Sequence, residues 1–318
     1  MKKLIVLTGP TAVGKTAASI GLAKAINGEI ISADSMQVYK KMDIGTAKIT
    51  KEEMEGVPHF LIDELNPDEE FSVAHFKKYA DKYINEVYER GHIPIIVGGT
   101  GFYIQAVLND IDFTETNADT EYRKELEELA RVNGPEYLHN MLFEIDPQAA
   151  EKIHFNNVKR VIRALEFYKE TGTKISEHND TQSAKSSPYN FAYFVLNDDR
   201  EALYERIDKR IDIMLENGLI EEVKALLDAG YDRKLTSMQG LGYKEIAAYL
   251  EGEISLEEAI YILKRDTRHF AKRQLTWFRR EKDVIFIDKS EYNGCDGILN
   301  KMLDVLEEKN IWRKDKNV

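Results

Sequence analysis

The chain has 318 residues, of which 43% are hydrophobic and 31% charged, and it contains a single cysteine, Cys295. This length predicts two domains, or one large domain with an insertion. No apolar run approaches the length of a membrane span, and one cysteine excludes an internal disulfide and a cysteine-rich metal site. We therefore expect a cytoplasmic protein without a membrane segment.

The net charge of −12 is unevenly distributed along the chain. Between Lys264 and Lys282, eight basic residues accompany two acidic ones, so this stretch carries +6 and the remainder −18. Affinity for nucleic-acid phosphates comes from Lys and Arg. The segregation predicts a local anionic partner, although a solvated helix face has the same composition.

The first hundred residues alternate apolar strands with helical stretches. Strands are predicted at Leu4–Leu7, Ile30–Ser32 and Ile93–Val97, and an amphipathic helix at Val73–Arg90. This alternation is typical of an α/β fold with a parallel sheet and helices on both faces.

The first strand ends in a phosphate-binding motif of the kind found in ATP- and nucleotide-binding proteins. Gly9-x-x-x-x-Gly14-Lys15-Thr16 has the P-loop spacing and lies between an apolar strand and a helix. Backbone N–H groups and the helix N-terminus hold phosphate oxygens, while Lys15 supplies a cation and Thr16 a ligand for Mg²⁺. The predicted diphosphate or nucleotide site is Gly9, Pro10, Thr11, Ala12, Val13, Gly14, Lys15 and Thr16.

Two further polar residues follow predicted strands. Asp34 comes after the second strand and Thr100 after the third, at the sheet edge where ligands bind in open α/β folds. Asp34 is a candidate catalytic base, or a cap of the following turn. Thr100 either lines the site or caps the next helix.

A helical insertion is predicted at 114–187, where the strand pattern disappears and helical segments such as Glu121–Arg131 and Asn157–Lys169 follow one another. The catalytic core then comprises residues 1–113 and 188–318. After the insertion, the pattern predicts strands and helices at Phe191–Leu196, Arg200–Glu216, Leu219–Ala229, Tyr243–Leu250, Leu256–Arg280 and Val284–Ile287. The seven His residues are scattered, so no transition-metal site is expected.

These segments together resemble one family, the bacterial tRNA dimethylallyltransferases, also called tRNA isopentenyltransferases. The resemblance covers essentially the whole chain and lies in Gly9–Thr16, Ile31–Lys48, Val57–Asp63, Ile96–Tyr103, Lys159–Glu166, Gly240–Glu245 and Arg273–Arg279. One departure is Phe155-Asn156-Asn157, where relatives commonly have Pro-Asn-Asp.

The resemblance implies transfer of a dimethylallyl group from dimethylallyl diphosphate to N6 of adenosine 37 of tRNA, with release of pyrophosphate. It implies that Asp34 is the base, that Thr100 lines the reaction channel, and that Arg206 or Arg210 meets the diphosphate. It also assigns the tRNA anticodon stem-loop to Asp34, Ser35, Met36, Gln37, Thr100, Arg123, Lys159, Arg160, Arg163, Lys272, Arg273, Gln274, Trp277 and Arg279. Mg²⁺ is the implied cofactor, and no obligate protein partner is inferred.

Two other functions fit part of the pattern. A P-loop kinase for a small metabolite would explain Gly9–Thr16 and the α/β core, but not the basic aromatic helix. A nucleotide-dependent RNA-binding module would explain the basic faces, but it would leave Asp34 and Thr100 without a role.

Overall fold

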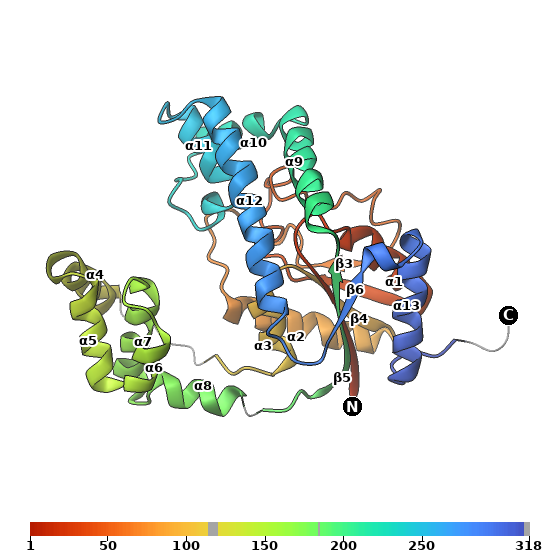
Figure 1. The fold of residues 1–318 in the computed structure, drawn as a ribbon, viewed down its shortest axis with the longest axis horizontal. Helices are drawn as coiled ribbons and strands as arrows, with labels where there is room; N and C mark the ends of the chain where they lie inside the picture. Colours follow the sequence, from red (N-terminus) through yellow and green to blue (C-terminus); the bar gives the residue numbers. More distant parts are fainter. Residues whose placement is uncertain (114–119, 184, 315–318) are drawn as a thin grey trace. The chain divides into compact units, whose positions relative to one another are not determined.

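The computed structural model describes residues 1–113, 120–183 and 185–314 (Figure 1). The chain divides into two compact units: unit 1 comprises residues 1–108 and 188–318, and unit 2 residues 109–187. Across the described segments, no helix combines the length and apolar character that crossing a bilayer requires.

Unit 1 is built on a six-stranded sheet in which every neighbouring pair is parallel, which confirms the predicted fold class. The strands are β1 (Lys2–Thr8), β2 (Gly28–Ser32), β3 (His59–Phe60), β4 (Ile93–Gly98), β5 (Tyr189–Asn197) and β6 (Val284–Asp288), in the order β3-β2-β4-β1-β5-β6. Strand β1 is central, and its residues Leu4–Leu7 are fully buried. A continuous apolar run is expected there, because helices cover a parallel sheet on both faces.

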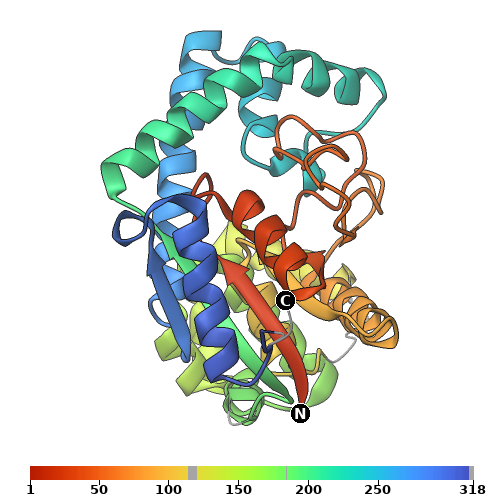
Figure 2. The ribbon, with the colours of Figure 1, turned by 90° about the vertical axis from the view of Figure 1, so that its right-hand side faces the viewer.

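Helices cover the sheet from two sides (Figures 1 and 2). Helices α1 (Lys15–Ile26) and α13 (Gly294–Glu308) pack together on one face, and α2 (Val73–Glu89) and α3 (Gly101–Leu108) on the other, where α3 also contacts α12 (Leu256–Phe278). Because all strands are parallel, their carboxyl ends lie at one edge of the sheet, and the P-loop follows β1 at this edge.

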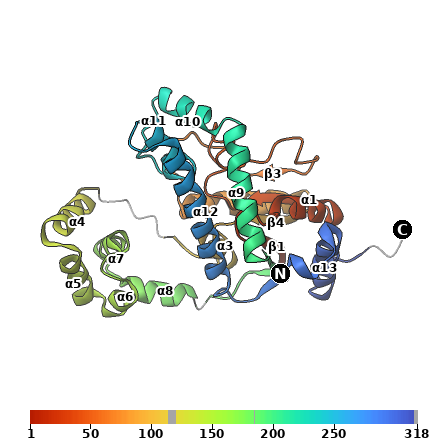
Figure 3. The same cartoon turned by 45° about the horizontal axis from the view of Figure 1, so that its top comes forward.

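A second group of helices extends the core at that edge. It comprises α9 (Arg200–Glu216), α10 (Leu219–Asp228), a 3-10 turn (Ser237–Gln239), α11 (Tyr243–Leu250) and α12. Helix α9 packs along α12, and α11 contacts both α10 and α12 (Figure 3). Side-chain oxygens cap the N-termini of two of these helices. Asp199 accepts from Glu201 N at 2.8 Å at the start of α9, and Ser255 accepts from Glu258 N at 3.2 Å at the start of α12.

Among its described residues, unit 2 contains helices joined by short turns, with no strand, and it has its own core. Its helices are α4 (Thr120–Asn133), α5 (Pro135–Ile145), α6 (Pro147–Lys152), α7 (Val158–Thr171) and α8 (Ile175–Ser183). Leu126, Leu138 and Leu142 are buried against α7. Buried Asp146 accepts from Ala149 N and from both N and Oγ of Ser176, which ties α6 to α8.

Candidate functional site

The P-loop has a backbone that only certain residues can adopt. Gly9 and Gly14 have φ of 148° and 98°, and Ala12, a non-glycine residue, has φ of 62°. A Cβ on Gly9 would lie 2.5 Å from the carbonyl oxygen of Leu196, so only glycine fits there. A strained turn at the end of a buried strand is typical of a functional site.

Cationic side chains surround this turn. Lys15 Nζ donates to the carbonyl oxygens of Gly9 at 3.0 Å and Pro10 at 2.9 Å. Arg206 Nε donates to Ala12 O at 3.2 Å, and Lys289 Nζ donates to Val13 O at 3.0 Å. Three positive charges from separate parts of the chain therefore converge on the loop, as an anion site requires.

Gln274, on α12, connects the P-loop to the end of β4. Its Oε1 accepts from Thr11 N at 2.9 Å and its Nε2 donates to Gly99 O at 3.0 Å, and the residue is 7% exposed. The family resemblance implies that Gln274 binds tRNA; in the structure both ends of its amide bind backbone.

A cavity of about 360 Å³ opens beside the P-loop at the carboxyl edge of the sheet. It brings together Asp34, Thr100 and Arg210 from three separate segments. Its polar and charged lining is Thr11, Asp34, Ser35, Thr46, Thr100, Arg210, Gln239, Tyr243, Lys244, Thr267, Arg273 and Gln274, and its apolar lining includes Met36, Ile207, Ile211, Met214, Leu241, Leu263 and Phe270. A largely apolar cavity with a few converging charges is the usual form of a small-molecule site.

Asp34 combines the two roles that the sequence left open. Its Oδ1 accepts from Met36 N at 2.9 Å, which is the hydrogen bond of a turn-forming Asp. The residue also lines the cavity. Backbone contacts fix its position, because Ala33 N donates to Val97 O at 2.8 Å and Gly98 leaves no room for a side chain against Ala33.

Lys15 and Arg210, two cations near the P-loop, both have lowered pKa values, and the carboxylate of Asp34 acts against both changes. Burial, followed by the charge of Arg210, lowers the pKa of Lys15 to about 8, and the carboxylate of Asp34 partly opposes this change. Burial also lowers the pKa of Arg210, against the effect of Asp34. Two partly dehydrated cations beside one carboxylate form a site that an anionic ligand would stabilise.

The two candidate diphosphate arginines lie in different surroundings. Arg210 lines the cavity, whereas Arg206 is held between Ala12 O and Asp198, whose Oδ2 lies 2.7 Å from the Arg206 guanidinium. Asp198 Oδ2 also lies 3.6 Å from Lys289 Nζ. Sequence reasoning missed Asp198 and Lys289, and only their positions after β5 and β6 could have indicated them.

Of the predicted tRNA residues, those after β2 line the cavity or bind backbone, and Thr100 lies after β4. Ser35 and Met36 line the cavity. Gln37 Nε2 donates to the carbonyl oxygens of Thr46 and Ala47, both at 3.3 Å. Thr100 precedes α3, and its carbonyl oxygen accepts from Tyr103 N at 3.0 Å.

The basic stretch on α12 divides into two parts. Lys264 and Arg268 pair with acidic residues of α9, at 2.6 Å in each case, and Arg265 pairs with Asp266 at 2.8 Å. Further along, side chains surround a shallow depression: His269, Lys272, Arg273, Thr276, Trp277 and Arg280. Arg279, the C-cap residue of α12, is also exposed.

The candidate tRNA residues of unit 2 lie on α4 and α7. Arg123 donates to both carboxylate oxygens of buried Glu166, at 2.8 and 2.7 Å. Lys159, Arg160 and Arg163 are exposed on α7.

Thr16, the predicted Mg²⁺ ligand, is exposed in the first turn of α1, next to Lys15. Among the described residues, no three His, Cys, Asp or Glu side chains cluster as a metal site would require. Mg²⁺ in phosphate sites takes most of its ligands from phosphate oxygens and water, so a single hydroxyl beside the P-loop suits this ion.

Comparison with known proteins gives one consistent result. The model of the family described as IPP transferase matches residues 37–281. The chain is 66% identical to the tRNA dimethylallyltransferase of Lachnoclostridium phytofermentans, over 98% of this chain and 99% of the relative.

Solved structures agree with this result. The full-length tRNA isopentenylpyrophosphate transferase from Bacillus halodurans is 49% identical, with a TM-score of 0.74 and 98% of each chain covered. A eukaryotic dimethylallyltransferase acting on tRNA is 31% identical, with a TM-score of 0.82 over 100% of this chain and 82% of that one.

Proposed function

The chain belongs to the IPP transferase family, and we propose that its P-loop holds dimethylallyl diphosphate while Asp34 deprotonates N6 of adenosine 37 in a tRNA anticodon loop. As a member of this family it is an enzyme that transfers a dimethylallyl group to tRNA. One observation carries the finer proposal: a single cavity at the P-loop is lined by both Asp34 and Arg210.

The proposed reaction is a substitution at the first carbon of the dimethylallyl group. The N6 lone pair forms the new C–N bond as the C–O bond breaks, and pyrophosphate leaves with the bonding electrons. The N6 proton passes to the carboxylate of Asp34. Lys15 and Arg210 stabilise the negative charge that develops on the leaving group, because Lys15 is held at the turn and Arg210 lines the adjoining cavity close enough to affect Lys15.

We assign the diphosphate contact to Arg210 rather than Arg206. Arg210 lines the cavity and lies near enough to Lys15 to lower its pKa. Arg206 is already committed to Ala12 O and Asp198, so its role is to hold the turn. When bound at the Thr16 hydroxyl, Mg²⁺ would neutralise part of the pyrophosphate charge.

A base within the anticodon loop reaches this cavity only after leaving its stack. The exposed cations Lys272, Arg273 and Arg279 lie on unit 1, and Lys159, Arg160 and Arg163 on unit 2. Exposed Lys and Arg side chains suit phosphate contacts, which position an RNA without reading its sequence. We assign the anticodon stem-loop to these residues.

Incubation with unmodified tRNA tests the function. The protein is supplied with dimethylallyl diphosphate or with ATP, and the digested nucleosides are analysed by mass spectrometry. We expect one prenyl group on adenosine with dimethylallyl diphosphate alone, and none on a transcript in which guanosine replaces adenosine 37. An ATP-dependent phosphate transfer, with no prenyl product, would contradict the proposal.

Asp34→Asn tests the base. The amide keeps an Oδ1 that can accept from Met36 N, so the turn is retained while proton acceptance is lost. Removal of a general base typically costs about 10²–10⁴ in rate, so single-turnover rates at saturating substrates should fall by that factor. Asp34→Ala removes both functions and should also lower thermal stability. A normal chemical step in folded Asp34→Asn would exclude Asp34 as the base.

A further inference from the structure

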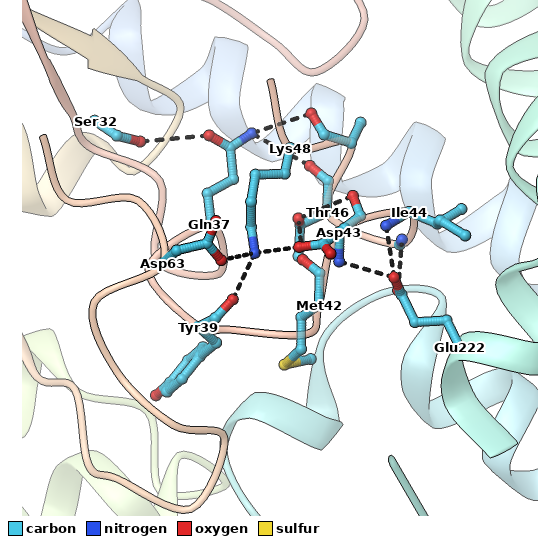
Figure 4. A network of polar contacts seen from close by, with 12 residues as sticks. Ser32, Gln37, Tyr39, Met42, Asp43, Ile44, Thr46, Lys48, Asp63 and Glu222 are labelled. Carbon is cyan, nitrogen blue, oxygen red and sulfur yellow. Dashed lines mark hydrogen bonds and ion pairs between the residues drawn. The ribbon is translucent and has the colours of Figure 1, made fainter. Parts of the chain in front are cut away.

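Glu222, on α10, accepts four hydrogen bonds from two different segments. Its Oε2 accepts from Asp43 N and Ile44 N, both at 2.8 Å, and its Oε1 accepts from Gly45 N at 3.1 Å and from Tyr243 Oη at 2.6 Å. Three consecutive backbone N–H groups form a concave site for an anion, and here a carboxylate of the chain itself fills it (Figure 4).

The loop that Glu222 binds is fixed from its other side as well. Lys48, whose side chain is 5% exposed, binds Asp43 and Asp63 at 2.5 Å each and donates to Tyr39 O at 2.7 Å (Figure 4). Thr46 Oγ1 donates to Met42 O at 2.6 Å. The loop from residue 39 to residue 48 is therefore held by two charged side chains: Glu222 binds its middle, and Lys48 binds the carbonyl oxygen at its start.

This loop is connected to the proposed base. Gln37 Nε2 donates to the carbonyl oxygens of Thr46 and Ala47, and the preceding residue, Met36, donates its N–H to Asp34 Oδ1. The position of the loop is thus linked to the position of Asp34 through Gln37. Gly45 and Thr46 themselves line the cavity.

The fourth donor belongs to another wall of the cavity. Tyr243 begins α11 and is buried, and the adjoining residues 240–244 line the cavity. A Cβ on Gly45 would lie 2.6 Å from the Tyr243 ring, so the two walls are in direct contact. Burial, and then the charge of Glu222, raise the pKa of Tyr243, so its hydroxyl stays protonated and continues to donate.

We propose that Glu222 is a positioning residue for tRNA modification: its carboxylate joins the loop of Gly45 to Tyr243 and so sets the spacing of the two cavity walls between which the target adenine is held. The inference rests on the proposed function of this cavity. It concerns the tRNA side of the site, because Glu222 makes none of its four hydrogen bonds to the P-loop.

Glu222→Gln is the direct test. The amide keeps the length of the side chain, but in either orientation its NH₂ group faces at least one backbone N–H of the loop, which cannot accept a hydrogen bond. The N–H groups of residues 43, 44 and 45 therefore cannot all stay bound. A misplacement of about 1 Å can cost 10²-fold in rate, so we expect kcat/KM for tRNA to fall by about 10- to 100-fold. Pyrophosphate affinity and the KM for dimethylallyl diphosphate should be unchanged. Glu221→Gln, on the next residue of the same helix, is the matched control.

Tyr243→Phe is the second variant, because it removes one donor and leaves the backbone contacts in place. A single hydrogen bond predicts a smaller loss of kcat/KM for tRNA, of about 2- to 10-fold. Unchanged kcat/KM for tRNA in Tyr243→Phe and in folded Glu222→Gln would overturn the proposal. So would a loss that only follows the fraction of folded protein, with both KM values unchanged. Wild-type protein that adds no prenyl group would instead contradict the proposed function.

Discussion

The lowered pKa of Lys15 predicts how diphosphate binding depends on pH. Its ammonium lies at the P-loop, where burial and Arg210 lower its pKa from 10.5 to about 8. The protonated form attracts phosphate, so affinity is fully present below pH 8 and is lost as the pH rises through the pKa of the free enzyme. A lysine with an ordinary pKa would show the same loss only about 2.5 pH units higher.

The expected size of the effect follows from this pKa. Above pH 8, each further pH unit leaves about one tenth as much free enzyme with a charged Lys15, so the Kd for pyrophosphate should rise about tenfold per unit. Isothermal titration calorimetry with inorganic pyrophosphate measures it. Lys15→Arg is the control, because its guanidinium stays charged, and the ratio of the two Kd values cancels the titration of pyrophosphate itself.

Two neighbouring residues sharpen this test. Asp34→Asn removes the carboxylate that raises the pKa of Lys15, so the midpoint should move to lower pH, while Arg210→Met should move it to higher pH. The two shifts have opposite signs, which a general loss of affinity cannot produce. A wild-type to Lys15→Arg ratio that stays constant up to about pH 9.5 would refute the reasoning.

Three other changes have defined outcomes. Lys289→Ala removes the donor to Val13 O and should raise the Kd for pyrophosphate about tenfold, whereas Glu291→Ala on the same turn should not. Lys272→Ala with Arg273→Ala should reduce the slope of log K for tRNA against log salt by about 1.4 to 1.8, while Lys264→Ala should change it little because Lys264 pairs with Asp212. Gly98→Ala places a methyl group 2.3 Å from the Ala33 carbonyl and should lower the Tm sharply, whereas Gly21→Ala, with its nearest neighbour at 3.9 Å, should not.

The parts of the site that the sequence predicts are those with a local signal. Gly9–Thr16 combines a fixed spacing with a strand before it and a helix after it, so the motif and its position could be inferred together. Asp34 and Thr100 follow buried strands, and parallel strands bring their carboxyl ends to one edge. Their meeting in one cavity therefore follows from the topology.

The contacts that hold the site in place have no such signal. Gln274 bonds Thr11 across 263 residues, and Lys289 bonds Val13 across 276. Glu222 belongs to a helix whose periodicity shows only that its apolar face is buried. No local pattern states which side chain of one element binds the backbone of another, since this depends on the packing of the whole unit.

For the basic stretch Lys264–Lys282, too, the sequence does not predict which of its residues are paired with acidic residues of another helix. The sequence predicts a helix at Leu256–Arg280 and so places the basic residues of this stretch on α12, but it says nothing about the neighbouring helix. In the structure, Asp208 and Asp212 of α9 neutralise part of this charge. The local excess of positive charge is consequently confined to the second half of α12.

A pair of substitutions can decide whether Arg123 binds tRNA or only stabilises unit 2. The resemblance assigns it to tRNA, while its guanidinium makes two hydrogen bonds to Glu166, a carboxylate that is 2% exposed. Removing Arg123 leaves that carboxylate buried without its partner. The cost should be about 3 kcal/mol, the low end for such a pair, because the Arg123 side chain is 44% exposed and partly screened.

The single variant cannot separate these roles, because lost stability and lost tRNA contact would both lower activity. Arg123→Met combined with Glu166→Leu removes the stranded carboxylate and should restore the Tm, as apolar replacements of buried ion pairs often do. Because the Arg123 side chain is 44% exposed, we expect tRNA binding by the stable double variant to stay weaker than that of the wild type at low salt. A double variant that binds tRNA like the wild type would show that Arg123 acts only within unit 2, through Glu166.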